Sequence, residues 1–534
     1  MKAATRALLL LSINLLALAC TRPTPPAPSG PSPLTSPLSP RLAAGRKLFV
    51  TPNTYNALSS IVTVGTSDFD SARVAYWAED ERERYTPFTV GRGVTQIPVL
   101  GLRPSVEYSY AVEGIKAGTM TRSDTVTALT GELPEFLKPV HMRTTGTGTR
   151  GYVLTAIADT GRTSYVVAFD SSGALRWYRE FPGELPAGET KQQPNGDFTA
   201  YVGRTPGWMP FPGFYHQFRP SGEIVRTIAA PPPLFTDNHE LVLTFRDTVL
   251  EAAHLFSFDL RPANLSAWGG PRDTLVAGHQ LLRVLPDGTV EKVLEGWDHF
   301  SWADRLEPPR DTLWDFDHPN SVTFDHDSNY IVSYRNMGEI TKIDRRSGAI
   351  IWRFGGHHNQ FKIRNDPLGG FSAQHSVRVL ADGNLLVYDN GTRHTPPETR
   401  AVEYRLDTKA MTADLVWEYR HSPPFYVPYT GSVQRLANGN TVIGFSNRGI
   451  VTEVNRRGDV VWEGTVMRRA DDAGDFYRAI KIASLYRYEA PERQEVEPAL
   501  GFAWATARGA ALARPPLFVN SHTRLPSSTS RIAP

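Results

Sequence analysis

The chain has 534 residues, too many for one ordinary hydrophobic core and enough for two or three domains. Its 57 Lys and Arg residues nearly balance its 55 Asp and Glu residues, and the net charge of +2 gives no support for nucleic-acid binding. Aromatic residues make up 10% of the chain, and its 43 Gly and 42 Pro residues suit short strands and turns better than helices. We therefore expect an all-β protein without a nucleic-acid partner.

Residues 1–20 are predicted to form a secretory signal peptide. Lys2 and Arg6 give a basic start, and the apolar run that follows, from Leu8 to Ala19, is too short to span a membrane. Cys20 follows at once and is the only cysteine, so no intrachain disulfide can form. The pattern resembles a bacterial lipoprotein signal and predicts a lipid on Cys20 as the sole membrane contact of a periplasmic or outer-membrane-tethered protein. A plain signal peptide with a chance cysteine is the alternative.

Two segments are expected to lie outside the folded domains. Residues 21–41 are nearly all Pro, Ser, Thr and Ala, a composition that cannot bury a core and predicts an extended, disordered tether. Residues 491–534 show no strand pattern and are predicted to be a C-terminal tail with at most a short helix at Ala503–Ala513.

Residues 42–132 are predicted to form a small β-sandwich domain. The runs Ser60–Val64 and Ala72–Trp77 have strand length and are alternating or apolar. Leu102–Pro104 then leads into Tyr108–Val112, an arrangement that resembles fibronectin-type sandwiches, in which a corner tyrosine ties a loop to the start of a strand.

One theme recurs across residues 133–490 and predicts a six-bladed β-propeller. A strand, an Asn-Gly or Asp-Gly turn and a second strand are followed by a Gly turn and a strand that bears Trp. The clearest Trp-bearing endings are Ser172–Trp177, Ser347–Trp352 and Arg457–Trp462. Roughly six such units, each of about 40 to 65 residues, fit four-stranded propeller blades. Because ring closure explains the Trp and Gly repeats, we assign them no catalytic role.

Three of the 14 histidines stand at the start of apolar strands in different units, namely His239, His318 and His375. The first strands of propeller blades line the central channel, so equivalent positions should converge on one end of it. Arg335 ends the strand that follows His318 and is expected beside them. Other histidines, including His279, are interpreted as packed or solvated residues.

Convergence of three imidazoles and one guanidinium leaves three interpretations open. Three histidines with a free coordination position form a catalytic zinc shell, although a nearby arginine would be repelled unless an anion offset it. Alternatively, guanidinium offers a planar fork to a tetrahedral oxyanion, neutral imidazole can be a nucleophile, and a second imidazole can move protons. In the third interpretation, the histidines only satisfy buried hydrogen bonds. Spacing alone does not choose among them.

A resemblance to a known family favours the anion site. The order His-x-Asn-Ser in Trp314–Ser321, a strand ending in Arg335, Gly355-Gly356, Gln374-His375 and Asp389–Gly391 resembles the bacterial arylsulfotransferase family. Members of that family are secreted six-bladed propellers that move sulfate between phenols without a nucleotide sulfate donor. The resemblance is strongest from residue 314 to residue 391.

The resemblance implies a role for each candidate residue. His375 would carry the sulfuryl group as a sulfohistidine, while Arg335, His318 and His239 would hold its oxygens. His318 is also expected to protonate the leaving oxygen and deprotonate the acceptor phenol, and Asn320 to orient a neighbour or bind a substrate oxygen. A phenolic sulfate donor and a phenol acceptor are implied, with no cofactor and no metal.

Three other functions stay open at this stage. A lipid-tethered propeller that binds a ligand or an envelope protein without catalysis fits the sandwich and the tether equally well. A metallohydrolase would use the histidines as metal ligands. A quinone-cofactor dehydrogenase fits less well, because the sequence has no dedicated cofactor motif beyond the Trp-bearing units.

Overall fold

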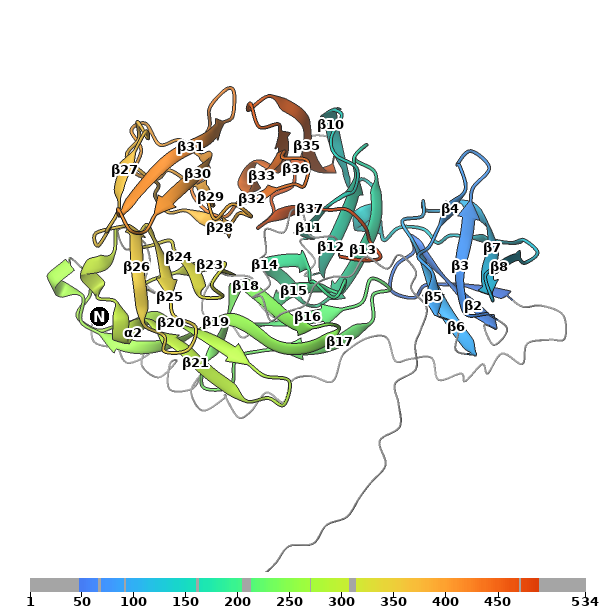
Figure 1. Cartoon of the computed structure of the whole chain (residues 1–534), viewed down its shortest axis with the longest axis horizontal. Coiled ribbons are helices and arrows are strands. Elements are labelled where there is room, and N and C mark those ends of the chain that lie inside the picture. The colour runs from blue at the N-terminus through green and yellow to red at the C-terminus, as the bar shows by residue number, and fades with distance from the viewer. Residues whose placement is uncertain are drawn as a thin grey trace, which may run out of the picture. The chain divides into compact units, whose positions relative to one another are not determined.

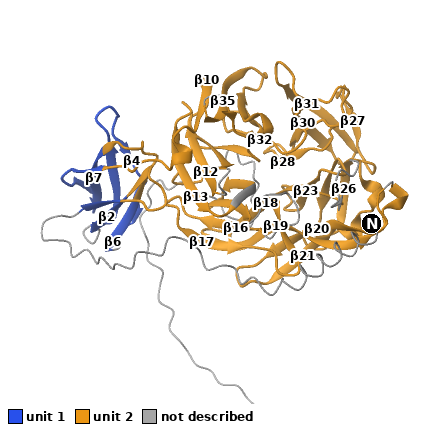
Figure 2. Ribbon diagram, turned by 180° about the vertical axis from the view of Figure 1, so that it is seen from behind, with its two compact units in different colours: residues 1–51, 61–97, 108–128 blue, residues 52–60, 98–107, 129–534 orange. Residues whose placement is uncertain are grey.

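The computed structural model describes residues 48–65, 69–90, 93–159, 163–203, 213–268, 270–306, 314–469 and 472–488. These residues are mostly β-strand (Figure 1) and divide into two compact units (Figure 2). The first unit includes residues 61–97 and 108–128, and the second includes residues 52–60, 98–107 and those from 129 on. The predicted signal peptide, Cys20, the tether and the C-terminal tail lie outside the described residues. None of the helices within the described ranges is long and apolar enough to cross a membrane.

Two sheets make up the first unit. One joins β1 (Leu48–Pro52), β2 (Ser59–Gly65) and β6 (Val94–Leu100). The other has the order β4 (Arg84–Tyr85), β3 (Ser71–Trp77), β7 (Glu107–Lys116) and β8 (Thr119–Arg122), with β5 (Thr89–Val90) on β3 and β9 (Val126–Leu129) on β7. Tyr108 at the start of β7 is fully buried, and its hydroxyl bonds to the Glu81 carboxylate at 3.2 Å. Tyr108 therefore ties the loop that contains Glu81 to the start of β7, by a hydrogen bond to the Glu81 side chain.

The first three blades of the second unit are antiparallel sheets of four strands. Blade 1 contains β37 (Ala479–Ile482), β11 (Tyr152–Ala158), β12 (Thr163–Asp170) and β13 (Leu175–Pro182). Blade 2 contains β14 (Leu185–Gln192), β15 (Phe198–Gly203), β16 (Gly213–Phe218) and β17 (Ile224–Ile228). Blade 3 contains β18 (Phe235–Arg246), β19 (Val249–Ala263), β20 (Thr274–Val284) and β21 (Val290–Glu295).

Three further blades follow along the chain. Blade 4 contains β23 (Pro319–Phe324), β24 (Tyr330–Tyr334), β25 (Glu339–Ile343) and β26 (Ile350–Gly355). Blade 5 contains β28 (His375–Val379), β29 (Leu385–Asp389), β30 (Arg400–Asp407) and β31 (Thr412–Arg420). Blade 6 contains β32 (Ser432–Arg435), β33 (Thr441–Phe445), β34 (Ile450–Val454) and β35 (Val460–Arg469), with β10 (His141–Gly146) added outside.

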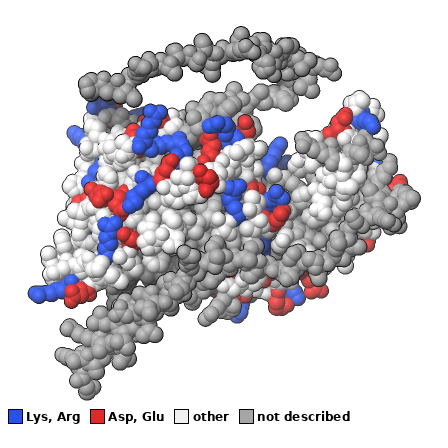
Figure 3. Space-filling view, turned by 90° about the horizontal axis from the view of Figure 1, so that it is seen from below, with Lys and Arg blue, Asp and Glu red and all other residues white. Residues whose placement is uncertain are grey.

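Short elements join or border the blades. Strands β22 (Trp314–Asp315), β27 (Lys362–Arg364) and β36 (Asp472–Ala473) pair with β20, β31 and β35, respectively. The helical turns are α2 (Gly296–His299), η1 (Glu135–Leu137), η2 (Ser266–Trp268), η3 (Trp302–Asp304) and η4 (Ser446–Arg448). The face of the molecule seen in Figure 3 carries positive and negative side chains intermixed, as the small net charge of +2 suggests.

The innermost strands meet around a ring. Strands β14, β18, β23, β28, β32 and β37 contact one another in succession, and β11, the partner of β37, contacts β14. The ring closes in two places, because the late strand β37 pairs with β11 and the early strand β10 pairs with β35. The predicted six-bladed propeller is therefore confirmed, and this double overlap links its two ends without a covalent bond.

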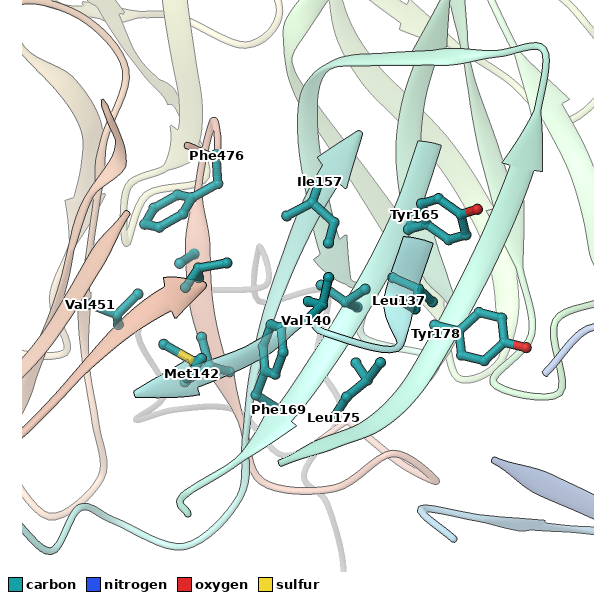
Figure 4. Close-up of a cluster of buried hydrophobic side chains, with 14 of the residues drawn as sticks. Leu137, Val140, Met142, Ile157, Tyr165, Phe169, Leu175, Tyr178, Val451 and Phe476 are labelled. Carbon is teal, nitrogen blue, oxygen red and sulfur yellow. The ribbon is translucent and has the colours of Figure 1, made fainter. Parts of the chain in front are cut away.

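A hydrophobic core seals the closure between blades 6 and 1. Ile157 and Phe169 of blade 1 face the same cluster as Val451 of blade 6 and Phe476 (Figure 4). All four side chains are buried, and full burial of such a side chain contributes about 1.5–3 kcal/mol. The packed cluster therefore holds the ends of the propeller together.

Tryptophan rings link the outer turns of neighbouring blades. The ring N–H of Trp177 donates to the Pro220 carbonyl at 2.8 Å, and that of Trp462 donates to the Ser171 carbonyl at 2.9 Å. Trp417 makes the same kind of bond to the Arg456 carbonyl at 3.1 Å. The repeated Trp thus has a structural task, since it joins one blade to the outer turn of the next.

Candidate active site

Each of the three predicted histidines lies where the innermost strand of its blade departs from a regular ladder. His239 lies in β18 of blade 3, within the register shift between Thr236 and Leu241. His318 directly precedes β23 of blade 4, whose register shifts after Pro319, and His375 begins β28 of blade 5 at another shift. Bulges of this kind re-aim side chains and are common beside active sites.

Left-handed backbone conformations gather at the same place. His318, Ala373, Ser376 and Thr430 have φ values of 53°, 51°, 51° and 60°. Such conformations disfavour residues with a Cβ atom and persist only where the surrounding structure holds them. The chain is therefore held locally in conformations that extended strands would not adopt.

The structure brings the predicted side chains together. The rings of His239 and His318 lie 4.6 Å apart between centroids, at 67° to each other. The Arg335 N–H donates to the His318 carbonyl at 2.9 Å. Burial of the His375 ring lowers its pKa well below the usual range, and the nearby charge of Arg335, with His318 and His239, lowers that pKa further. His375 is therefore a neutral imidazole at neutral pH.

Asn390 fixes which nitrogen of His375 carries the proton. The Asn390 amide N–H₂ donates to the Val427 and Thr430 carbonyls at 2.8 and 3.0 Å, so its oxygen must face His375. That oxygen lies 2.7 Å from His375 Nδ1, and the Ala373 carbonyl lies 3.1 Å from the same atom. Because both neighbours are acceptors, Nδ1 carries the hydrogen and Nε2 keeps its lone pair. The Thr430 backbone N–H donates to Nε2 at 3.3 Å.

Carboxylates hold the other two histidines in a similar way. Nδ1 of His239 lies 2.8 Å from Asp237 Oδ1, and Nδ1 of His318 bonds to Asp315 Oδ2. Each ring thus directs Nδ1–H to an acid and leaves Nε2 for contacts on its other side. Burial lowers the pKa of His318, and His239 and Arg335 lower it too, although Asp315 raises it. The net shift is downward.

Asn320 and Arg335 connect the site to other segments of the same chain. The Asn320 side chain is fully buried, and its N–H₂ donates to the Gln374 carbonyl at 2.7 Å, directly before His375. The guanidinium of Arg335 donates to the Asn336 side chain at 3.0 Å and to the Pro428 carbonyl at 3.1 Å. Asn320 therefore positions the peptide that carries His375, and Arg335 is held from both sides.

Residues 228–468 match the model of a family described as arylsulfotransferase (ASST). The likeness to the arylsulfotransferase family rests on this segment. It contains blades 3 to 5 and all five residues that form or support the site, His239, His318, Asn320, Arg335 and His375. The family that the motifs resemble is thus the family that the segment matches.

A curated relative agrees over a short stretch. The arylsulfate sulfotransferase AssT of Escherichia coli O6:H1 is 37% identical over 82 residues. That match covers 14% of this chain and 14% of the relative, so it spans about a seventh of either protein.

Solved structures give only distant likenesses. A protein of unknown function from Bacteroides caccae has 13% identity and a TM-score of 0.38, over 62% of this chain and 98% of that one. A catalytically inactive virginiamycin B lyase from Staphylococcus aureus has 9% identity and a TM-score of 0.29, over 60% and 87%. At these TM-scores the likenesses support no conclusion about the arylsulfotransferase segment.

One group of potential metal ligands is present within the described part of the chain, and it does not consist of the three predicted histidines. Ligand atoms of His279, Asp315 and Asp317 lie within 4.8 Å of one another. However, His279 Nδ1 is only 2.6 Å from Asp317 Oδ1, the separation of a strong charge-assisted hydrogen bond. A proton shared by these two atoms accounts for the geometry.

Sequence reasoning missed the acidic residues behind the histidines. Asp237 stands two residues before His239, Asp317 directly before His318, and Asp315 three residues before His318. Acids this close to candidate histidines were a usable signal, because an imidazole is commonly oriented by a carboxylate on its second nitrogen. His279 is a packed residue as interpreted, but the sequence did not indicate that both of its ring nitrogens face carboxylates.

Proposed function

We propose that the chain is an aryl-sulfate sulfotransferase that moves a sulfuryl group from a phenolic sulfate to a phenol through a sulfohistidine. The observation that carries the proposal is the neutral His375, whose Nδ1 faces the Asn390 oxygen and whose pKa is lowered by the nearby charges of Arg335, His318 and His239. The family match supports sulfotransfer as the reaction. The name of the matched relative, arylsulfate sulfotransferase, supports aryl sulfates as donors.

In the first half-reaction, Nε2 of His375 attacks the sulfur of the donor. An N–S bond forms while the S–O bond to the phenol breaks, and the phenol oxygen leaves with the electron pair. The Thr430 N–H, which donates to the same lone pair at 3.3 Å, has to release it before attack. In the second half-reaction the acceptor oxygen attacks sulfur, the N–S bond breaks, and His375 returns to its neutral form.

Proton transfer falls to a second imidazole. His318 would take the proton of the acceptor phenol as that oxygen attacks and give it to the leaving oxygen of the next donor. Its lowered pKa makes the neutral, proton-accepting form dominant at neutral pH. A donor whose phenolate is a good leaving group needs no proton, so this step matters most for donors that are poor leaving groups.

The remaining groups would stabilise the charge on the sulfuryl oxygens. The charge of Arg335 acts on the pKa of His375, and a guanidinium binds oxyanions with a planar fork. His239 offers Nε2 because its Nδ1 is bound by Asp237. We expect Arg335→Ala to weaken binding of the sulfate donor and to lower kcat by about 10²- to 10³-fold, as measured by steady-state rates.

Trapping the intermediate tests the proposal directly. The full chain is incubated with p-nitrophenyl sulfate without an acceptor and digested under alkaline conditions, and the peptide containing His375 is analysed by mass spectrometry. We expect the mass of one sulfuryl group on His375 and a burst of one p-nitrophenol per chain. A modified residue elsewhere, or steady turnover without a burst, would contradict the sulfohistidine. No release of p-nitrophenol at all would favour a non-catalytic ligand-binding propeller.

We also propose that the protein is exported and tethered to a membrane by a lipid on Cys20. The support is the short apolar run from Leu8 to Ala19 directly before the only cysteine. Wild type should fractionate with membranes and incorporate labelled fatty acid, whereas Cys20→Ser should do neither. Unchanged membrane association of that variant would contradict the proposal.

A further inference from the structure

His279 lies outside the ring of inner strands, yet it reaches the site. It belongs to β20, the third strand of blade 3, and it is 2% exposed. The ring of Phe258 packs beside it, with 5.6 Å between centroids. A histidine at this position would normally be expected to fill a core.

Both ring nitrogens of His279 face carboxylates that come from the inner strands. Nδ1 lies 2.6 Å from Asp317 Oδ1, and Nε2 lies 3.5 Å from Asp237 Oδ2. A neutral imidazole can donate from only one nitrogen, whereas an imidazolium donates from both. The two contacts therefore fit a protonated ring that bridges blades 3 and 4.

The same two carboxylates hold the histidines of the site. Asp237 Oδ1 accepts from the backbone N–H of His239 at 2.9 Å and from its Nδ1 at 2.8 Å. Asp317 Oδ1 accepts from the backbone N–H of His318 at 3.1 Å. His279 thus contacts both the carboxylate that holds the His239 ring and the carboxylate that holds the His318 backbone.

We propose that His279 is a positioning residue that couples the supports of His239 and His318 and so fixes the direction of both site imidazoles. This inference rests on the proposed sulfotransferase function. His279 does not touch the reacting atoms and acts through Asp237 and Asp317. Groups that hydrogen-bond to the partner of a histidine help to fix its ring orientation and tautomer.

The electrostatics agree with the geometry. Burial by itself lowers the pKa of His279, but the carboxylates of Asp317, Asp237 and Asp315 raise it well above the usual value. Burial raises the pKa of Asp237, but His239 and His279 lower it by more. The histidine is therefore charged and Asp237 ionised, as a fixed acceptor for Nδ1–H of His239 requires.

The same blade offers a matched control. His254 lies in β19, beside β20, and is also fully buried. It contacts the Tyr330 hydroxyl at 2.9 Å and the Thr244 hydroxyl at 3.4 Å, with no carboxylate. Burial, with Arg345 and Arg283, lowers its pKa to about 3, so it is a neutral packing residue. His254→Gln removes a buried imidazole from the same sheet without touching the acids of the site.

Steady-state kinetics of the full chain with p-nitrophenyl sulfate and phenol compare the two variants. We expect His279→Gln to lower kcat by about 10- to 100-fold with little change in KM, the size of effect seen when a residue that orients a functional histidine is removed. His254→Gln should lower thermal stability and leave kcat near that of wild type. Equal losses of kcat in both variants, or no loss in a folded His279→Gln, would overturn the proposal.

A double-mutant cycle separates positioning from general loosening of the fold. If His279 acts through Asp237 and Asp317, then Asp237→Asn should lower kcat, and adding His279→Gln to it should lower kcat by a smaller factor than His279→Gln does alone. Fully multiplicative losses would mean that the two residues act independently, and the proposed coupling would be wrong.

A readout without turnover distinguishes failure of this inference from failure of the proposed function. Nitrogen NMR of the full chain labelled in histidine should show His239 and His318 protonated at Nδ1 in wild type and as tautomer mixtures in His279→Gln. This test holds even if wild type transfers no sulfate, a result that would reject only the proposed function. Unchanged tautomers, or one equivalent of a divalent metal lost with His279→Gln, would overturn the positioning role.

Discussion

The outer turns of blades 1, 4 and 6 are built alike, whereas the inner strand ends of blades 3, 4 and 5 each depart from the ladder in their own way. In each of those outer turns a side-chain oxygen accepts a hydrogen bond from the backbone N–H two residues later. The accepting residues are Asp170, Asp344 and Asn455. A glycine with positive φ completes each turn. All three inner ends have register shifts, and those of blades 4 and 5 add left-handed residues that have side chains, His318, Ala373 and Ser376.

Gly173 shows why the outer turns tolerate so little variation. Its φ is 86°, and a Cβ atom there would collide with the Met142 carbonyl of blade 6. The Met142 N–H donates to the Gly173 carbonyl at 2.8 Å, so the turn is also part of the ring closure. The comparison shows that the repeated outer turns build the ring of blades, whereas irregular strand ends position the residues of the site.

The largest expected effect would test the irregular region. His375→Ala removes the only neutral imidazole whose Nε2 lone pair is assigned to attack, so sulfate transfer should fall by about 10⁴-fold or more. The circular dichroism spectrum and melting temperature should stay close to those of wild type, because outer turns and inter-blade tryptophans are untouched. Release of p-nitrophenol measures the effect, with His254→Gln as control. Full activity in His375→Ala would remove the nucleophile assignment.

Substitution of Arg478 would test whether buried ion pairs of the inner strands also stabilise the fold. Its guanidinium lies 2.9 Å from both Glu189 and Glu240, all three are almost fully buried, and it contacts the His239 carbonyl at 3.5 Å. Arg478→Met removes one of the cations that pair with Glu189 and Glu240 and leaves Lys191 as their shared partner, which should cost up to about 3–5 kcal/mol of unfolding free energy. Because His239 loses a contact, kcat should fall as well.

Urea unfolding and steady-state rates would be measured side by side for Arg478→Met. The control is Arg219→Met, which breaks an exposed pair with Glu223 and should leave unfolding nearly unchanged. If Arg478→Met lowers stability without lowering kcat, the inner channel and the site are separate, and the contrast drawn between inner and outer regions is too simple.

The sequence allowed the ring to be predicted because its turn chemistry is local and repeats. Trp177 and Trp462 with their glycines mark blade ends whatever surrounds them. It did not reveal which strands close the ring, because β37 (Ala479–Ile482) is a short apolar segment with no feature that specifies β11 as its partner. Strand pairing across more than 300 residues depends on the whole ring, not on the segment.

The sequence predicted only those site residues that lie at the start of an inner strand. His239, His318 and His375 satisfy that rule, and their convergence follows from it. His279 does not, since it belongs to a third strand and reaches the site through Asp237 and Asp317. The loop that contains Thr430 was also missed, because its contacts with His375 and Arg335 come from an irregular connection that follows no repeat.

The pH dependence would sharpen the assignment of the two histidines. Burial lowers the pKa of both His375 and His318 below the usual value, so both are neutral at pH 7 and gain a proton only in more acidic solution. For a donor with a poor leaving group, the rate should rise by up to about tenfold per pH unit as pH falls toward the pKa of His318.

A donor with a good leaving group provides the comparison. Its rate should stay flat over the same range and fall only where His375 itself is protonated. Rates of donors that differ in the acidity of the released phenol would be measured from pH 8 down to the limit of stability. Identical profiles for good and poor leaving groups would contradict proton transfer by His318.

The smallest expected effect would test the repeating region. Trp177→Phe keeps an aromatic ring between Phe198 and Phe218 but removes the N–H that donates to the Pro220 carbonyl at 2.8 Å. Loss of this bond leaves a carbonyl without its donor, which should lower the unfolding free energy by about 1–3 kcal/mol. The exposed Trp268, changed to Phe, is the control and should alter stability by at most about 0.5 kcal/mol.

Neither tryptophan variant should change kcat or KM at temperatures where the protein stays folded, since the outer turns touch no residue of the site. Chemical unfolding and turnover would be measured on the same preparations. A kcat that falls with Trp177→Phe would mean that the outer turns transmit strain to the inner strand ends. The repeated outer turns and the irregular site would then be mechanically coupled, and not independent parts of the propeller.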